Sequence, residues 1–351
     1  MIFCRLARRY VPKWICLICI FVENKDDMKP TTLDLKVPRG WQQCSTRELE
    51  MIAEEMIRAQ MMASLSRFHP FDWVEIKTRL FFRFAEVEVT DMVEDEYEND
   101  VFICRHPSLG KTEFPLETWQ VHSFLEQLKW LDATDGKGRP LPMPKMMWPY
   151  PERLWRLRWK RWKPEKDYYR PGELLDGMTW QQYRLANDWM EAYTNAANGL
   201  IAEQEKHAKA NPERIRSLAE QQENARLEVL AQLFYVSDPA EPSKVKSAPR
   251  RLLRKITEVE WQVVMFWWSS MMQYLKEQYP KCFKSSAKPS RSKQQPLPIE
   301  LYTRSMATLQ KYLGGLTEDE INAQTAHAIL RHLNDMAVEA EEMEKIRRKH
   351  K

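Results

Sequence analysis

Apolar residues recur three or four positions apart through most of this 351-residue chain. In residues 43–62, for example, Leu49, Ile52, Ala53 and Met56 fall on one side of a helix. The same spacing predicts further helices over residues 71–87, 117–131, 180–193, 212–236, 258–279, 299–315 and 318–351. The pattern therefore predicts a mainly α-helical protein.

Local start signals support several of these helices. In a capping box, a Ser or Thr side chain bonds the backbone N–H three residues on, and the Glu or Gln at that position bonds back. Proline is also favoured in the first turn, where Pro212 lies. The pairs with capping-box spacing are Ser45 with Glu48, Thr179 with Gln182, Thr257 with Glu260, and Thr317 with Glu320.

Residues 100–116 have the pattern of a short β-hairpin. Val101 and Ile103 alternate with Phe102 and Cys104, and the turn residues Pro-Ser-Leu-Gly follow before a second apolar stretch. We therefore predict two antiparallel strands within an otherwise helical N-terminal region.

Residues 86–100 carry eight acidic residues and no basic one. Grouped carboxylates can bind a divalent cation, but this run lacks the glycine and the alternating spacing of a calcium loop. We interpret it as a solvated acidic loop. The opposite charge gathers around 153–163, 244–255 and 281–293, and such blocks can contact one another within a chain or between copies.

Stretches rich in Pro, Ser and Lys at 237–255 and 284–298 are expected to be linkers that divide the helical pattern, and the chain is longer than one core usually organises. The predicted fold class is mainly α, with a small N-terminal α+β domain containing the hairpin and a multi-helix C-terminal domain. The predicted parts are a small α+β domain at 33–147, a Pro/Trp/basic strap at 148–171, a helical domain at 172–283, a linker at 284–298 and a C-terminal helical hairpin at 299–351.

Residues 1–32 form an N-terminal extension with three interpretations. The apolar stretch at 14–22 is too short to span a bilayer, although basic residues before it imitate the start of a signal peptide. No small-residue cleavage site follows. Translation could instead start at Met28, or the stretch could be a packed strand, and the sequence leaves these alternatives open.

Composition narrows the function class. Nine glycines are few, which disfavours glycine-rich phosphate loops and turn-rich β-sandwiches. Eighteen methionines and fourteen tryptophans supply much adaptable apolar surface. The net charge of +4 is too small to indicate a nucleic-acid binder by itself.

We expect a non-enzymatic protein without a metal or cofactor, because no residue pattern predicts such chemistry. His327 and His332 are five apart and fall on different helix faces. The CxxC at 16–19 lacks a second pair, and Cys104 with His106 lacks a third partner. The six cysteines, without paired spacing over most of the chain, fit a reducing compartment.

The stretch "LWRLRWKRWKP", residues 154–164, places three tryptophans among five basic residues. We favour a strap that docks on its own protein, with cations lying over the indole faces. Single-stranded nucleic acid is the alternative ligand, since rings stack on bases and cations follow the backbone, and a membrane-surface element is a third interpretation. The candidate residues are Trp155, Arg156, Arg158, Trp159, Lys160, Arg161 and Trp162.

Helices rich in aromatic residues and methionine form a second candidate site. The helix predicted over 258–279 is apolar on nearly every side, so it is either central to a bundle or part of an interface. Met and Trp most often form core, but they also suit surfaces that accept varied apolar partners. The candidate partner-binding residues are Trp180, Tyr183, Trp189, Trp261, Phe266, Trp267, Trp268, Met271 and Met272.

The aromatic patterns "VEIKTRLFFRFAEV", "EFPLETWQVHSFLEQLKWL", "LLDGMTWQQYRLANDWMEAY" and "WWSSMMQYLKEQYPKCF" occur in this order. Over residues 33–283 the chain resembles tail-assembly proteins encoded beside the tape-measure gene in some prophages. The resemblance implies a chaperone-like, non-enzymatic factor in the cytoplasm of a bacterial host, which holds the long apolar tape-measure chain or another tail protein.

Self-association is compatible with this interpretation, and no membrane partner is expected. The alternative hypothesis is a nucleic-acid-binding accessory protein that uses residues 153–163 and 244–255. The resemblance carries over no catalytic residues.

Overall fold

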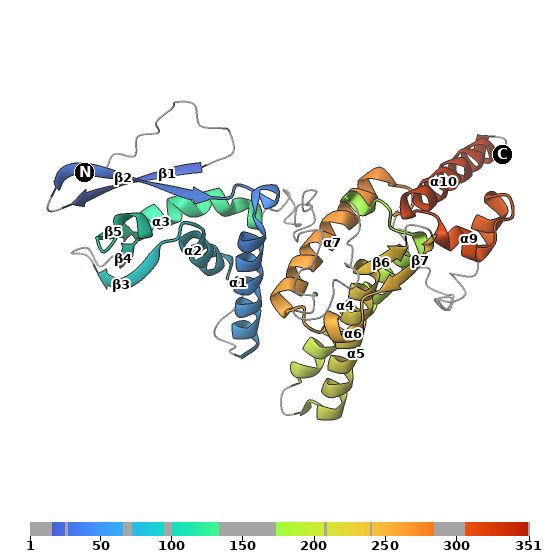
Figure 1. Cartoon of the computed structure of the whole chain (residues 1–351), viewed down its shortest axis with the longest axis horizontal. Helices are drawn as coiled ribbons and strands as arrows, with labels where there is room; N and C mark the ends of the chain where they lie inside the picture. The colour runs from blue at the N-terminus through green and yellow to red at the C-terminus, as the bar shows by residue number, and fades with distance from the viewer. Residues whose placement is uncertain are drawn as a thin grey trace. The chain divides into compact units, whose positions relative to one another are not determined.

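The computed structural model describes residues 16–24, 27–65, 72–94, 100–132, 173–206, 209–238, 241–283 and 306–349. The chain divides into two compact units, Met1–Pro149 with Glu258–Ser270, and Tyr150–Thr257 with Met271–Lys351. Helices dominate both units, and a small antiparallel sheet lies near the N-terminus (Figure 1). The predicted fold class is therefore confirmed.

The first unit combines helices with two small sheets. Strands β1 and β2 form an antiparallel hairpin, and β3, β4 and β5 form a three-stranded antiparallel sheet in that order (Figure 1). Its elements are β1 (Cys16–Asn24), β2 (Asp27–Val37), η1 (Trp41–Gln43), α1 (Thr46–Leu65), α2 (Trp73–Phe84), β3 (Glu88–Glu94), β4 (Asp100–Arg105), η2 (Pro107–Leu109), β5 (Glu113–Glu117), α3 (Thr118–Leu125) and η3 (Glu126–Leu131).

Polar caps explain where α1 and α2 begin. The Ser45 N–H donates to Glu48 Oε2 at 2.6 Å, and the Glu48 N–H donates to Ser45 Oγ at 3.3 Å, which confirms the predicted capping box. Helix α2 begins after Asp72, whose carboxylate accepts the Val74 N–H at 2.8 Å.

The three-stranded sheet contains the predicted hairpin and one strand more. Strands β4 and β5 confirm the hairpin, but the acidic loop expected at 86–100 was wrong for Glu88–Glu94, which pairs with β4 as β3. Val89, Thr90 and Val93 favour an extended backbone, and pairing with the next strand, β4, satisfies its hydrogen bonds. A β-bulge lies between Val89 and Asp91.

The core of the first unit lies between the helices and the two sheets. Phe81 of α2 stacks on Phe124 of α3 with ring centroids 5.1 Å apart, and Phe82 contacts Phe102 of β4 at 5.5 Å. The Lys77 ammonium bonds a carboxylate at the end of η3, 2.8 Å away. The largest fully buried side chains of this unit are Trp261, Trp267, Phe81, Phe114, Leu35, Ile52, Ile76, Leu80, Leu116 and Leu128.

Helix α7 (Glu258–Gln278) supplies residues to both units. Its first part belongs to the first unit, where Phe266 lies against Trp41 at a centroid distance of 5.3 Å. Trp41 also meets Trp130 of η3 edge to face at 5.1 Å, and Trp130 Nε1 donates to the Pro38 carbonyl. Residues from three distant parts of the sequence therefore enclose Trp41. Residues 258–270 were predicted to belong to the helical domain at 172–283, whereas the structure places them in the first unit.

The second unit is built mainly from helices. Helices α4 and α5 form a long hairpin, and the short strands β6 and β7 pair antiparallel after it (Figure 1). Besides the rest of α7 and the helical residues 306–312, its elements are η5 (Glu173–Leu175), α4 (Trp180–Gln204), α5 (Pro212–Leu233), β6 (Tyr235–Asp238), β7 (Glu241–Ser247), α6 (Arg250–Leu253), α9 (Glu318–Ala323) and α10 (Ala326–Lys349).

Two local expectations for this unit were wrong around residue 236. The helix predicted over 212–236 ends at Leu233, and part of the linker expected at 237–255 is strand β7 and helix α6. Tyr235 and Val236 favour strands, and prolines at 239 and 242 prevent the helix from continuing. Pairing across the turn therefore replaces the helical pattern.

The helix predicted over 318–351 is broken between α9 and α10. The Trp180 N–H donates to the Gln324 carbonyl at 2.7 Å, and the Ala326 N–H donates to the Met178 carbonyl at 2.8 Å. These bonds hold the break against the start of α4. Trp180 also packs on an apolar cluster that joins the C-terminal helices, formed by Met306, Leu309, Ile321 and Ile329.

Two of the predicted capping boxes are confirmed here, and the pairing of Thr257 with Glu260 stays a prediction. Thr179 and Gln182 form a capping box at α4, and Thr317 and Glu320 form one at α9. The turn at Gly314–Gly315 has φ angles of 76° and 87°, which glycine adopts without a steric penalty.

Candidate functional site

Most of the predicted partner-binding side chains belong to the core. The buried ones are Tyr183, Trp261, Phe266, Trp267, Trp268 and Met271. Trp180 and Met272 are half-buried, and Trp189, at 37% exposure, is the most accessible of the nine. The core interpretation therefore describes the six buried side chains, which are not a surface in this structure.

Trp189 lies beside the buried stripe of α4 rather than on it. Tyr183, Ala186 and Met190 are buried at spacings of three and four, and Trp189 falls at the border of this stripe. The Tyr183 hydroxyl lies 3.9 Å from Met272 Sδ, and burial raises the pKa of this tyrosine above its ordinary value. The stripe fixes α4 within its unit.

The tryptophan-rich basic segment at 153–163 lies outside the described residues. The strap and nucleic-acid interpretations of Trp155, Arg156, Arg158, Trp159, Lys160, Arg161 and Trp162 therefore stay predictions. In the basic stretch at 244–255, the structure places Arg250 in an ion pair with Glu228, and Arg254 and Lys255 are exposed.

The histidines on α10 have separate structural partners, as their spacing predicted. His327 Nε2 lies 2.6 Å from the Leu174 carbonyl, which can only accept, so this nitrogen carries a proton. His327 Nδ1 lies 2.9 Å from the Tyr279 hydroxyl. Leu174 has a left-handed φ of 58°, a costly conformation for leucine, and the histidine bond holds it there. The ring of His332 meets Tyr312 instead.

Burial keeps the thiols of Cys44, Cys104 and Cys282 protonated. It raises the pKa of Cys104 to about 12 and that of Cys282 to about 11, and it raises the pKa of Cys44 as well. A thiol in this state is a poor nucleophile at neutral pH. His106 does not face Cys104 as a base, because its Nδ1 bonds Ser108 Oγ at 2.7 Å. Among the described residues, His, Cys, Asp and Glu form no group that would hold a metal ion.

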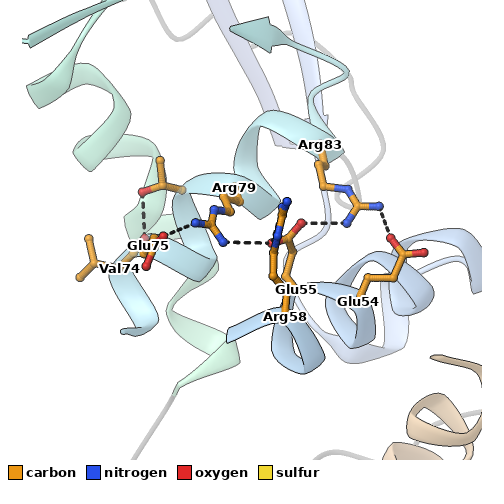
Figure 2. A network of polar contacts seen from close by, with 8 residues as sticks. Glu54, Glu55, Arg58, Val74, Glu75, Arg79 and Arg83 are labelled. Carbon is orange, nitrogen blue, oxygen red and sulfur yellow. Dashed lines mark hydrogen bonds and ion pairs between the residues drawn. The ribbon is translucent and has the colours of Figure 1, made fainter. Parts of the chain in front are cut away.

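A network of charged side chains joins α1 to α2 (Figure 2). At its centre the Glu55 side chain is only 5% exposed. Glu55 Oε1 accepts a hydrogen bond from Arg83 Nη1 at 2.9 Å. Glu55 Oε2 lies 3.7 Å from Arg79 Nη1 and 3.9 Å from Arg58 Nη1, so three guanidinium groups surround one buried carboxylate.

Two further carboxylates complete this network. Arg83 also bonds Glu54, and Arg79 bonds Glu75 on its own helix (Figure 2). Although burial opposes it, hydrogen bonds to Glu54 and Glu55 raise the pKa of Arg83. The charges of the network balance, so it fastens two helices rather than supplying an acid or a base. The pattern of Glu75, Arg79 and Arg83 at four-residue spacing was the sequence signal for it.

The helix ends next to this network expose apolar side chains. Met61 and Met62 near the end of α1 are 57% and 46% exposed, and Val74 in the first turn of α2 is 46% exposed. We call these three residues the α1–α2 tip, since residues 66–71 join the two helix ends. Val74 is apolar and exposed, because it lies away from the buried Leu80 side of its helix. Helix periodicity alone does not show where the core ends.

Within the described ranges, no helix is long and apolar enough to cross a membrane. Comparison with protein families, curated proteins and solved structures found no match to this chain.

Proposed function

We propose that this chain is a non-enzymatic factor of phage tail assembly that acts in the cytoplasm of a bacterial host. Its partner is a long, apolar, helical protein of the tape-measure kind, which must be kept soluble until the tail tube polymerises. The proposal combines the sequence resemblance over residues 33–283 with one structural observation, the exposed apolar α1–α2 tip.

The α1–α2 tip has the chemistry that such a partner requires. Methionine is flexible and polarisable, so Met61 and Met62 can pack against apolar side chains of varied shape. The ion pairs between α1 and α2 hold the helices that present them. A firm scaffold under adaptable side chains lowers the entropy lost on binding.

Co-expression with the tape-measure protein encoded beside this gene tests the proposal. The wild-type chain should keep the partner soluble and co-purify with it. The double variant Met61→Glu/Met62→Glu should recover at least about tenfold less partner, because two charges would have to be desolvated in the complex. The control Met343→Glu alters a methionine of α10 with 55% exposure and should bind normally.

Two results would count against this function. If the wild-type chain neither solubilises nor retains the partner, the tail-assembly role is wrong. If binding persists unchanged in the double variant, the role stands but the α1–α2 tip is not the binding surface. Circular dichroism of each variant establishes that the fold is retained.

The exposed basic residues after α6 favour a second candidate function, single-strand nucleic-acid binding. Arg254 and Lys255 are exposed within the basic stretch at 244–255, and cations of this kind contact phosphates. An electrophoretic shift with a labelled oligonucleotide should then weaken steeply between 50 and 200 mM salt, by about tenfold or more. Loss of the shift in Arg158→Ala/Trp159→Ala would support this function, and no shift at low salt would exclude it.

A further inference from the structure

Strand β3 is an open edge of the three-stranded sheet. It pairs with β4 on one side, and among the described residues no strand pairs with its other side (Figure 1). All seven residues from Glu88 to Glu94 are exposed. The other edge strand, β5, instead buries Phe114 and Leu116. An exposed strand edge offers a row of backbone groups to which another strand can bind.

The register assigns the side chains of β3 to two different faces. Val89 lies opposite Cys104 and Met92 opposite Phe102, so both share the face that packs on α2 through Phe82. The bulge between Val89 and Asp91 explains how residues three apart share a face. Val89 and Met92 are 39% and 57% exposed, so the apolar side of the sheet continues uncovered to its edge.

The opposite face of the edge carries the acidic Glu88 and Asp91 and the exposed Val93, which lies opposite Val101. Glu88 lies opposite Arg105, and Asp91 lies opposite Ile103. Arg105 already pairs with Glu113 of β5. A strand added here would place alternate side chains beside Glu88 and Asp91, so basic side chains are favoured at those positions.

One backbone donor of the edge is held by a local bond. The Met92 N–H donates to Asp91 Oδ1 at 2.8 Å. A carbonyl of an added strand can take over this donor, which frees the Asp91 carboxylate to pair with a cation. The local bond is then replaced by two interactions, one from the Met92 N–H to the added strand and one from Asp91 to a basic side chain, which favours pairing with a basic strand. A second copy of β3 would instead place carboxylates opposite carboxylates.

We propose that β3 binds an extended, basic segment of a partner protein, in which apolar and basic residues alternate, as a fourth strand. The apolar residues of that segment cover Val89 and Met92, and its basic residues pair with Glu88 and Asp91. The same acidic side chains discourage pairing with neutral or acidic edges. This surface lies on the sheet, and the inference does not rest on the tail-assembly role.

Fluorescence anisotropy of labelled nine-residue peptides with the full chain tests this proposal. The peptide RVRIRVTVR should bind, and its counterpart with Glu in place of Arg should bind at least about tenfold more weakly. The double variant Glu88→Lys/Asp91→Lys should reverse this preference. The control Glu205→Lys/Glu342→Lys makes the same change of net charge at two exposed positions, one just after α4 and one in α10, and should keep the wild-type preference.

A second arm separates strand pairing from charge attraction alone. N-methylation of alternate residues in the basic peptide leaves its charge unchanged and removes the donors that a strand needs. Binding should fall at least about tenfold when the methyl groups face β3 and much less when they occupy the other alternate positions. Equal binding of both methylated peptides and the parent, a preference unaffected by Glu88→Lys/Asp91→Lys, or no binding of the basic peptide would each overturn the proposal. Unchanged circular dichroism of the variants rules out unfolding.

Discussion

The network around Glu55 makes an asymmetric prediction about stability. Arg83→Met leaves a carboxylate that is 5% exposed without its 2.9 Å hydrogen bond, and an unsatisfied buried acceptor costs about 1–3 kcal/mol. The guanidinium groups of Arg79 and Arg58 remain 3.7 and 3.9 Å from Glu55 Oε2, so we expect the free energy of unfolding to fall by about 2 kcal/mol. Glu55→Leu instead leaves guanidinium groups that are 33–63% exposed and can be hydrated, so it should cost under about 1 kcal/mol.

Hydrogen exchange followed by mass spectrometry measures this difference within the intact chain. Peptides from α1 and α2 should exchange about 30-fold faster in Arg83→Met, and less than about fivefold faster in Glu55→Leu. Peptides from α5 in the other unit serve as the internal reference. The double variant should resemble Glu55→Leu, because no buried charge remains in it. A larger effect for Glu55→Leu than for Arg83→Met would refute the reasoning.

Three further predictions concern the second unit. Tyr279→Phe removes the hydroxyl beside His327 Nδ1 and should cost about 1 kcal/mol, seen as a lower thermal midpoint; an unchanged midpoint would show that this bond contributes nothing. Hydrogen bonds from Lys206 and then from the backbone at the start of α5 lower the pKa of Glu203 in the folded state. This carboxylate therefore stabilises the fold above its unfolded pKa of about 4.3, and the stabilisation is lost as the pH falls through its folded pKa. The thermal midpoint of Glu203→Gln should therefore fall less between pH 6 and pH 3 than that of the wild-type chain. An equal fall in both proteins would contradict this. Gly199→Ala places a methyl group 3.1 Å from a leucine side chain of α5 that can shift. The gain in helix propensity should therefore raise the free energy of unfolding by up to about 1 kcal/mol. A lower thermal midpoint would mean that the leucine cannot move.

Local chemistry made parts of the fold predictable. The capping boxes at Ser45, Thr179 and Thr317 depend on residues three positions apart, and all three are present. Strand β3 and the break at Gln324–Thr325 depend on pairing with residues outside their own segments, with β4 for the strand and with Thr179 for the break. Pairing of that kind leaves little trace in the pattern of one segment, so a loop and a continuous helix were predicted instead.

The candidate sites show the same division. Sequence correctly identified α7 as apolar on nearly every side, but the pattern could not decide between core and interface, and the buried Trp261 and Trp267 decide for core. Met61 and Met62 continue the helical pattern of α1 beyond the residues that the core covers. The packing of the surrounding elements decides which residues of a helix are covered. The α1–α2 tip is therefore visible only in the structure.

The contact between Trp41 and Phe266 has a consequence for synthesis on the ribosome. The first unit needs residues 258–270, so its sequence is complete only after most of the second unit has been translated. At a translation rate of about 5–20 residues per second, roughly ten seconds separate the synthesis of residue 149 from that of Phe266. During that interval the nascent chain lacks part of the cover over this indole, and we expect cellular chaperones to bind there. A fragment that ends at residue 149 would keep that exposure permanently.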